Sequence, residues 1–134
     1  MTSELKYKDI AEKIIGAAFE VHKFLCNACL PDRQGFPVVI YQRALAWELD
    51  QAGLSFSREI EQHIFYRELT ETIGTRRADF VVEEKVLVEL KAVIELEDVH
   101  HIAQVLNYLK AYRLEVGLLI NFGSKSLTFK RLVF

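Results

Sequence analysis

The apolar positions of the chain follow a helical period in its first third. Apolar side chains recur every three or four residues across residues 8–25, at Ile10, Ile14, Ala17, Val21 and Leu25. That spacing places them on one side of a helix. A second stripe of this kind over residues 39–52 predicts a second helix, for which Gly53 is a suitable end. Residues 27–37 contain both prolines and predict a loop between the two helices.

Shorter segments with the character of β-strands follow. They are residues 57–67, 77–83, 86–93, 116–121 and 127–134, and a helical stripe over residues 97–113 lies between the third and the fourth. Residues 116–121 are almost wholly apolar, as in a central strand that is buried on both faces. The order α-α-β-β-β-α-β-β predicts an α/β (α+β) fold, in which helices flank a mixed β-sheet.

The size and charge of the chain narrow its function. Its 134 residues suit a single domain that spans residues 1–134. A formal net charge of -2 excludes a broad basic surface, so any contact with nucleic acid would be local. No apolar run approaches the roughly 18 residues of a membrane span, and the polar start of the chain does not have the apolar stretch of a signal peptide. We therefore expect a soluble, cytoplasmic protein without membrane contact.

Two cysteines, Cys26 and Cys29, form a C-N-A-C segment. A metal site would need two more ligands, and the histidines have no standard spacing for a second half-site. A redox pair is expected where a strand meets a helix, whereas this pair follows a helix. We interpret both residues as small thiols of a reducing cytosol, with metal binding and redox chemistry as the alternatives.

Three charged residues interrupt two of the predicted strands. Asp79 lies in one strand, and Glu89 and Lys91 lie two positions apart in the next. If the strands form a hairpin, the length of the bend decides whether Asp79 faces Glu89. A three-residue loop places the two carboxylates opposite each other, whereas a two-residue loop puts them on opposite faces. The bend has no Asn-Gly or Asp-Gly, which favours the longer loop and pairs Val82 with Val86.

Facing carboxylates repel each other unless a cation lies between them. Carboxylate oxygens are the ligands that Mg²⁺ and Mn²⁺ prefer, so we predict that Asp79 and Glu89 bind one of these metals. A metal held there would activate water against a phosphodiester bond, and the ammonium of Lys91 would stabilise charge on the phosphate. In the alternative interpretation, Glu89 and Lys91 are a solvated ion pair on the wet face of a strand.

Gln104 and Tyr108, four residues apart, share one side of the third predicted helix. Together with Asp79 and the segment Glu89-Leu90-Lys91, they resemble the core motifs of the PD-(D/E)XK nucleases, including the Q-x-x-x-Y motif of the RecB-like branch. This resemblance implies a metal-dependent hydrolase that cleaves the phosphodiester bonds of DNA, with RNA as the alternative substrate. It also implies catalytic roles for Asp79, Glu89, Lys91, Gln104 and Tyr108.

A closer resemblance covers nearly the whole chain. Residues 14–22, 76–79, 88–93, 104–109 and 117–123 are similar to the GxxExxY proteins, a small bacterial family of the same superfamily. In that family Glu20, on the first helix, would be a further acidic residue facing the site, and the alternative is a solvated residue on the flank of the helix. The segment that corresponds to the family name reads Gly35-Phe36-Pro37-Val38-Val39-Ile40-Tyr41, with Val38 where the family has glutamate.

The departure at Val38 supports a second hypothesis, a nuclease-fold protein with weak or no activity that acts as a self-assembling or binding module. The apolar C-terminus, residues 131–134, would pack against another copy. We expect a homo-oligomer, for which a two-fold dimer is the simplest case. His100 and His101 are not assigned a role. Four basic residues are candidates to border a phosphate track, with ordinary surface charges as the alternative: Arg76, Arg77, Lys110 and Arg113.

Overall fold

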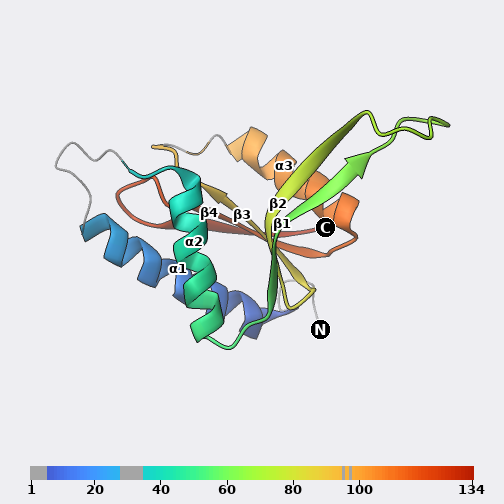
Figure 1. Cartoon of the computed structure of the whole chain (residues 1–134). Helices are drawn as coiled ribbons and strands as arrows, with labels where there is room; N and C mark the ends of the chain where they lie inside the picture. The colour runs from blue at the N-terminus through green and yellow to red at the C-terminus, as the bar shows by residue number, and fades with distance from the viewer. Residues whose placement is uncertain (1–5, 28–34, 95, 97) are drawn as a thin grey trace.

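The computed structural model of the chain describes all residues except 1–5, 28–34, 95 and 97 (Figure 1). Its helices are α1 (Lys8–Asn27), α2 (Val38–Gln51) and α3 (Asp98–Tyr112). Its strands are β1 (Phe56–Ile64), β2 (Gly74–Val82), β3 (Val86–Lys91), β4 (Val116–Asn121) and β5 (Thr128–Val133). The order of elements and the fold class predicted from the sequence are confirmed.

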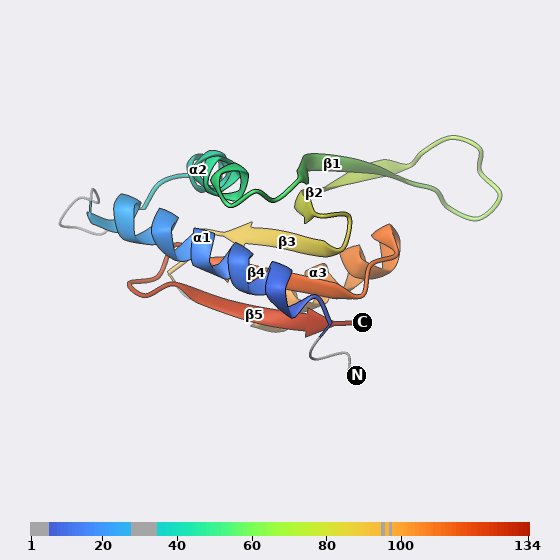
Figure 2. The same cartoon turned by 90° about the horizontal axis from the view of Figure 1, so that it is seen from below.

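The described strands form one five-stranded sheet in the order β1-β2-β3-β4-β5. Strands β3 and β4 are parallel, and the other neighbours are antiparallel. A parallel pair needs a crossover connection, and α3 supplies it. Helices α1 and α2 pack on one face of the sheet, and α3 packs on the other (Figure 2).

Two hydrophobic cores lie on the two faces of the sheet. The larger core, beneath α1 and α2, includes Val86, Val88 and Leu90 of β3. The smaller core, beneath α3, includes Leu87 of β3 and Leu119 of β4. Alternate side chains of β3 thus enter different cores. Every residue of β4 is buried, as its apolar sequence predicts.

The bend between β2 and β3 has three residues, and Val82 pairs with Val86 as predicted. Glu83 and Glu84 have left-handed backbone conformations, with φ angles of 54° and 57°, which are uncommon for residues other than glycine. Ser55 stabilises the bend, because its backbone N–H donates to Glu83 Oε2 at 2.8 Å and its carbonyl accepts from the Glu83 N–H at 2.8 Å. These bonds support the register on which the placement of the charged side chains depends.

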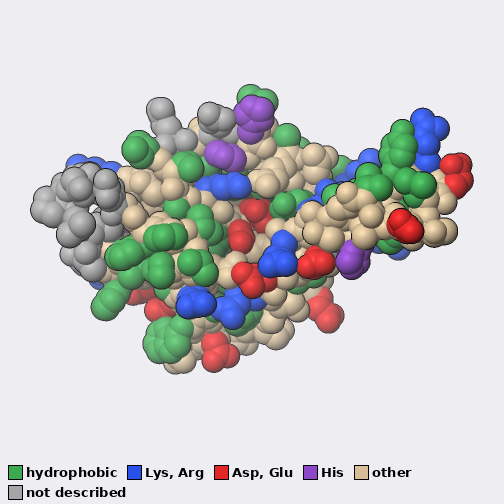
Figure 3. All heavy atoms as spheres, turned by 45° about the horizontal axis from the view of Figure 1, so that its top comes forward, with side chains coloured by type: hydrophobic (Ala, Val, Ile, Leu, Met, Phe, Trp, Pro, Cys, Tyr) green, Lys and Arg blue, Asp and Glu red, His purple; other side chains and the backbone are tan. Residues whose placement is uncertain are grey.

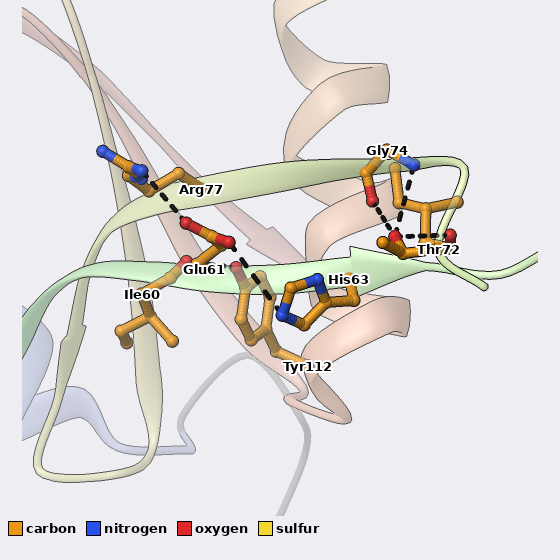
Figure 4. A network of polar contacts seen from close by, with 8 residues as sticks. Ile60, Glu61, His63, Thr72, Gly74, Arg77 and Tyr112 are labelled. Carbon is orange, nitrogen blue, oxygen red and sulfur yellow. Dashed lines mark hydrogen bonds and ion pairs between the residues drawn. The ribbon is translucent and has the colours of Figure 1, made fainter.

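The hairpin of β1 and β2 extends beyond the rest of the domain (Figures 1 and 2). We call residues 60–77 the arm. Tyr112 of α3 ties the base of the arm to the domain, because its hydroxyl donates to the Ile60 carbonyl at 2.6 Å (Figure 4). Farther out, the Thr72 hydroxyl lies 2.6 Å from the carbonyl oxygen of Gly74. The end of the arm exposes four large apolar side chains, those of Phe65, Tyr66, Leu69 and Ile73.

Three strand boundaries differ from the sequence prediction by more than one residue. In the arm, β1 ends at Ile64 and β2 begins at Gly74, three residues earlier than predicted in each case. Strand β3 ends at Lys91 rather than at Val93. The Asn121 side chain explains the last difference, because its Oδ1 accepts from the Val93 N–H at 3.0 Å and its Nδ2 donates to the Val93 carbonyl at 2.9 Å.

Cys29 and the side chain of Cys26, which we predicted to be free thiols, lie outside the described residues. Among the residues that the structure describes, no helix is long and apolar enough to cross a membrane.

Candidate active site

Asp79 lies where the regular pairing of β2 is interrupted on both sides. The pairs between β2 and β3 run only from Val82 to Phe80. On the other side, the ladder between β1 and β2 skips Glu59, whose φ angle is 53°. Asp79 is therefore the residue at which β2 leaves the central sheet and continues into the arm.

Side-chain carboxylates take over the hydrogen bonding at this break. The Asp79 N–H donates to Glu89 Oε1 at 3.1 Å, and the Leu90 N–H donates to Asp79 Oδ2 at 2.8 Å. Each carboxylate thus binds the backbone beside the other. The prediction that the three-residue bend brings Asp79 and Glu89 together is confirmed.

Burial changes the protonation of both carboxylates, of which Glu89 is buried and Asp79 is half-buried. Glu89 is only 4% exposed, and its pKa is raised from 4.5 to about 8, first by burial and then by the charge of Asp79. Burial also raises the pKa of Asp79, although hydrogen bonds from the Leu90 N–H and from Gln42 oppose the shift. The alternative of a solvated Glu89 on a wet strand face is therefore wrong. A site with this local charge favours a proton or a metal cation.

Lys91 is linked to the third helix rather than to Glu89. Its Nζ donates to Gln104 Oε1 at 2.7 Å, and Gln104 Nε2 donates to the Tyr108 hydroxyl at 3.4 Å. The helical spacing of Gln104 and Tyr108 places both on the side of α3 that faces this part of the sheet, as predicted. Burial and the nearby charge of Glu89 raise the pKa of the Tyr108 hydroxyl, so that it stays protonated.

The end of β3 beyond Lys91 is held by a close approach of two backbone segments. The Phe122 N–H donates to the Lys91 carbonyl at 2.8 Å. A Cβ atom on Gly123 would lie 2.3 Å from the Val93 nitrogen, so the approach requires glycine at this position. Glycine here and the Asn121 side chain therefore set where the strand that carries Lys91 stops.

The structure also shows a contributor that the sequence analysis did not find. Gln42 of α2 is 5% exposed, and its Nε2 donates to Asp79 Oδ1 at 3.0 Å. Gln42 shares one side of the helix with Leu45 and Leu49, which are fully buried. A polar residue within that apolar stripe was the signal in the sequence. The contact spans 37 positions and follows from the fold.

Glu20 and Val38 lie apart from these contacts. Glu20 is exposed on α1 and lines a hollow between α1 and α2 together with Phe24 and Trp47. Among the described residues, no hydrogen bond or ion pair joins Glu20 to Asp79. Val38 is the first residue of α2 and packs against the larger core. The catalytic role of Glu20 stays a prediction.

The donor set suits a divalent cation of the Mg²⁺ type. Only Oε1 of Glu89 accepts a hydrogen bond from the described residues, which leaves its Oε2 available as a ligand. No group of three or more His, Cys, Asp and Glu side chains in the described part of the chain could hold a metal ion. Two carboxylates are nevertheless a common protein contribution to Mg²⁺, which completes its octahedron with water and phosphate oxygens. In Figure 3, acidic side chains gather near the middle of the face, beside basic and histidine side chains.

Comparison with protein families agrees with this architecture. The family model of the PD-(D/E)XK nuclease superfamily matches residues 8–132, and the chain belongs to this superfamily. Among solved structures, the crystal structure of SSO0001 is similar, with 21% sequence identity and a TM-score of 0.54. The match covers 70% of this chain and 48% of SSO0001, so it spans about half the length of that protein and shows the fold alone. A comparison with curated proteins found no match.

Proposed function

We propose that the protein is a metal-dependent nuclease that hydrolyses phosphodiester bonds of DNA, with RNA as the alternative substrate. The observation that carries this proposal is the hydrogen-bonded pair of a half-buried Asp79 and a buried Glu89, beside an ammonium that is oriented by Gln104. Membership of the nuclease superfamily, whose members generally use divalent metals such as Mg²⁺, supports it.

In this proposal, Asp79 and Glu89 are the protein ligands of Mg²⁺ or Mn²⁺. The metal, when bound, would lower the pKa of a water molecule and polarise the phosphate. The hydrogen bonds that Asp79 accepts from Gln42 and from the Leu90 N–H fix the orientation of its carboxylate. Gln42 thereby acts as a positioning residue.

Lys91 carries the positive charge of the proposed chemistry. Its ammonium would donate hydrogen bonds to the attacking water and to the phosphoryl oxygens, where negative charge increases in the transition state. Gln104 orients that ammonium by accepting one of its hydrogen bonds, and Tyr108 in turn accepts from Gln104. A nitrogen that already has one fixed partner loses less freedom when it engages the phosphate.

The resemblance to the GxxExxY proteins suggests roles in the proposed site for Gln42 and Glu20. Val38 stands where that family has glutamate, and Gln42 follows it by four residues, one turn later on α2. We infer that Gln42 provides the contact from α2 to the site that Val38 does not make. The same resemblance makes Glu20 of α1 a further acidic residue of the proposed site.

The proposal is tested with labelled single- and double-stranded DNA and RNA, in Mg²⁺ and in Mn²⁺. We expect metal-dependent cleavage by the wild-type protein and none by Lys91→Ala. Because an ammonium is not a metal ligand, calorimetry should show that Lys91→Ala still binds Mn²⁺. Cleavage by Lys91→Ala at the wild-type rate would contradict the proposed role of Lys91 and indicate a contaminating nuclease.

A second candidate function is a nuclease-fold module that acts by self-association. The exposed apolar side chains at the end of the arm favour it, because contiguous exposed apolar surface is typical of interaction sites. Strands β1 and β5 are the two edges of the sheet and offer unpaired backbone groups to another copy. Light scattering at micromolar concentration should then give the mass of a dimer. A monomer mass, together with metal-dependent cleavage, would leave the nuclease as the remaining candidate.

A further inference from the structure

A hollow of about 580 Å³ lies beside the candidate active site. One wall comes from the arm and the other from α3, and the lining includes Ile64, Arg76, His100, His101, Asn107 and Tyr108. Gln104, which accepts a hydrogen bond from Lys91, also lines it. The hollow therefore begins where the proposed catalytic groups end.

Two neighbouring arginines of β2 differ in how their charges are satisfied. Arg77 lies on one side of the arm and forms an ion pair with Glu61 at 3.1 Å (Figure 4). Arg76, whose side chain points to the other side, lines the hollow with its guanidinium 5.8 Å from the centre of the Tyr108 ring. Its Nε is buried and has no hydrogen-bond partner among the described residues, and no described carboxylate forms an ion pair with it.

A buried guanidinium nitrogen without a partner is unfavourable unless a ligand satisfies it. The planar donor groups of arginine match the oxygens of a phosphate. The aromatic ring of Tyr108 and the amide of Asn107 provide the kinds of groups that contact sugars and bases of nucleic acids. All of these groups line one hollow that is continuous with Gln104.

We propose that this hollow binds the nucleotide next to the cleaved bond, with Arg76 contacting its phosphate. This inference rests on the proposed nuclease function and adds a substrate-binding residue to it. The bound strand then runs from the carboxylate pair, past Lys91 and Gln104, into the space between the arm and α3. The arm serves as one wall of the substrate channel. Arg76 supplies a local positive charge on this wall, although the net charge of the chain is -2.

The test compares Arg76→Ala with Arg77→Ala in cleavage assays over a series of salt concentrations. Both variants remove one positive charge from adjacent positions of the same strand, but only Arg76 lines the hollow. We expect the KM of Arg76→Ala to rise about tenfold with kcat within about twofold, because the lost contact binds substrate and transition state alike. The slope of log KM against log salt should fall by about 0.7–0.9, as for the loss of one phosphate contact. Arg77→Ala should have the wild-type KM and slope.

Two further variants separate charge from folding. Arg76→Lys should keep the wild-type salt slope, because it keeps the charge, and raise KM about threefold through loss of the planar donor group. If circular dichroism shows that Arg76→Ala does not fold, Arg76→Gln, which keeps most of the aliphatic side chain and a polar end without the charge, provides the same measurement.

The other possible results distinguish failure of the Arg76 inference from failure of the proposed nuclease function. Equal KM values for wild type and Arg76→Ala, or equal losses in Arg76→Ala and Arg77→Ala, would overturn the inference and leave the nuclease function in place. Competition by a poly-aspartate peptide as strong as that by an oligonucleotide of equal charge would show a general anion site and overturn the nucleotide assignment. Absence of cleavage of any DNA or RNA by the wild-type protein would overturn the proposed function itself, and this inference with it.

Discussion

The two halves of β2 have opposite surroundings, although one strand runs through both. In the half that belongs to the central sheet, Phe80 and Val82 are fully buried and pair with β1 on one side and β3 on the other. In the half that belongs to the arm, Thr75 and Arg77 are exposed, and the strand pairs with β1 alone. Asp79 lies between the two halves.

This difference separates two tasks of the proposed site. The buried half can fix the position of the neighbouring Asp79, because the backbone of residues 80–82 is paired on both sides and packed into a core. The arm can present side chains such as Arg76 to a long ligand, because one of its sides faces the hollow next to α3. The comparison predicts that substitutions in the two halves change different measured quantities.

The largest expected effect is the loss of turnover on substitution of Asp79, which lies between the two halves of β2. If Asp79 and Glu89 hold the metal as proposed, Asp79→Asn should lower kcat at least about 10⁴-fold, about 5.5 kcal/mol in the activation barrier, because it removes one of the two proposed carboxylate ligands. Removal of a charge next to Glu89 should offset the loss of one of the two hydrogen bonds that Asp79 accepts, from Gln42 and from the Leu90 N–H, so stability should change by no more than about 1 kcal/mol. Glu71→Gln, which removes an exposed carboxylate at the end of the arm, is the matched control and should keep wild-type kcat. A substantial kcat in Asp79→Asn would show that this carboxylate is not a ligand.

The second effect is on stability as a function of pH, in metal-free protein. The pKa of Glu89 is about 8 in the folded state against 4.5 for the free group. A raised carboxylate pKa stabilises the folded state at low pH, and this stability is lost as the pH rises from the unfolded-state to the folded-state value. Relative to Glu89→Gln, the wild-type protein should therefore lose up to about 5 kcal/mol of unfolding free energy over that interval.

Denaturant unfolding with a chelator at several pH values measures this loss. Glu61→Gln is the control, because Glu61 forms an exposed ion pair with Arg77 and such pairs contribute about 1 kcal/mol or less. Addition of Mg²⁺ should restore most of the lost stability above pH 8 in the wild-type protein but not in Glu89→Gln. Identical pH profiles of wild type and Glu89→Gln would contradict the buried, raised-pKa state of Glu89.

The third effect is a difference in unfolding free energy between a substitution in the buried half of β2 and one in the arm half. Phe80→Ala should lower the free energy of unfolding by about 3–5 kcal/mol, because Phe80 is fully buried in the larger core and also packs edge-on against Phe56. Thr75→Ala, five residues away in the arm, should cost less than about 1 kcal/mol. Equal losses in urea denaturation would show that the arm is as strongly packed as the central sheet.

The smallest effect concerns the attachment of the arm. Tyr112→Phe removes the hydroxyl that donates to the Ile60 carbonyl and should cost about 1 kcal/mol. Amide hydrogen exchange in the arm should become faster, while exchange in β3 and β4 stays unchanged. Tyr66→Phe is the control, because its hydroxyl contacts only the exposed Arg67 side chain among the described residues. Uniform acceleration across the whole sheet in Tyr112→Phe would contradict a local role.

The parts of the fold that the sequence predicted are those with a clear burial pattern. Strand β4 was predicted because all of its residues are buried, and the register of the bend followed from the parity of Asp79 and Glu89. The start of β2 was missed because residues 74–77, although they alternate between half-buried and exposed, include no apolar side chain, so no apolar–polar alternation marks them in the sequence. The early end of β3 depends on Asn121, which is distant in sequence from Val93.

The candidate site shows the same division. Asp79, Glu89 and Lys91 were found because charges within apolar strands are costly and require a reason. Gln104 was found by its helical spacing to Tyr108. Gln42 was not found, because its place within the apolar stripe of α2 shows only that it is buried, whereas the strand that its amide contacts lies 37 positions away and is brought near by the fold. Arg76 could not be distinguished from Arg77 by sequence, because the distinction depends on which side of the strand faces α3.

The bend between β2 and β3 limits how the gene for this protein can change in length. Insertion or deletion of one codon among residues 83–85 would turn one strand over relative to the other and put Asp79 and Glu89 on opposite faces. A change of two codons would preserve the faces and shift only the loop. Viable length variants of this hairpin should therefore differ by even numbers of residues.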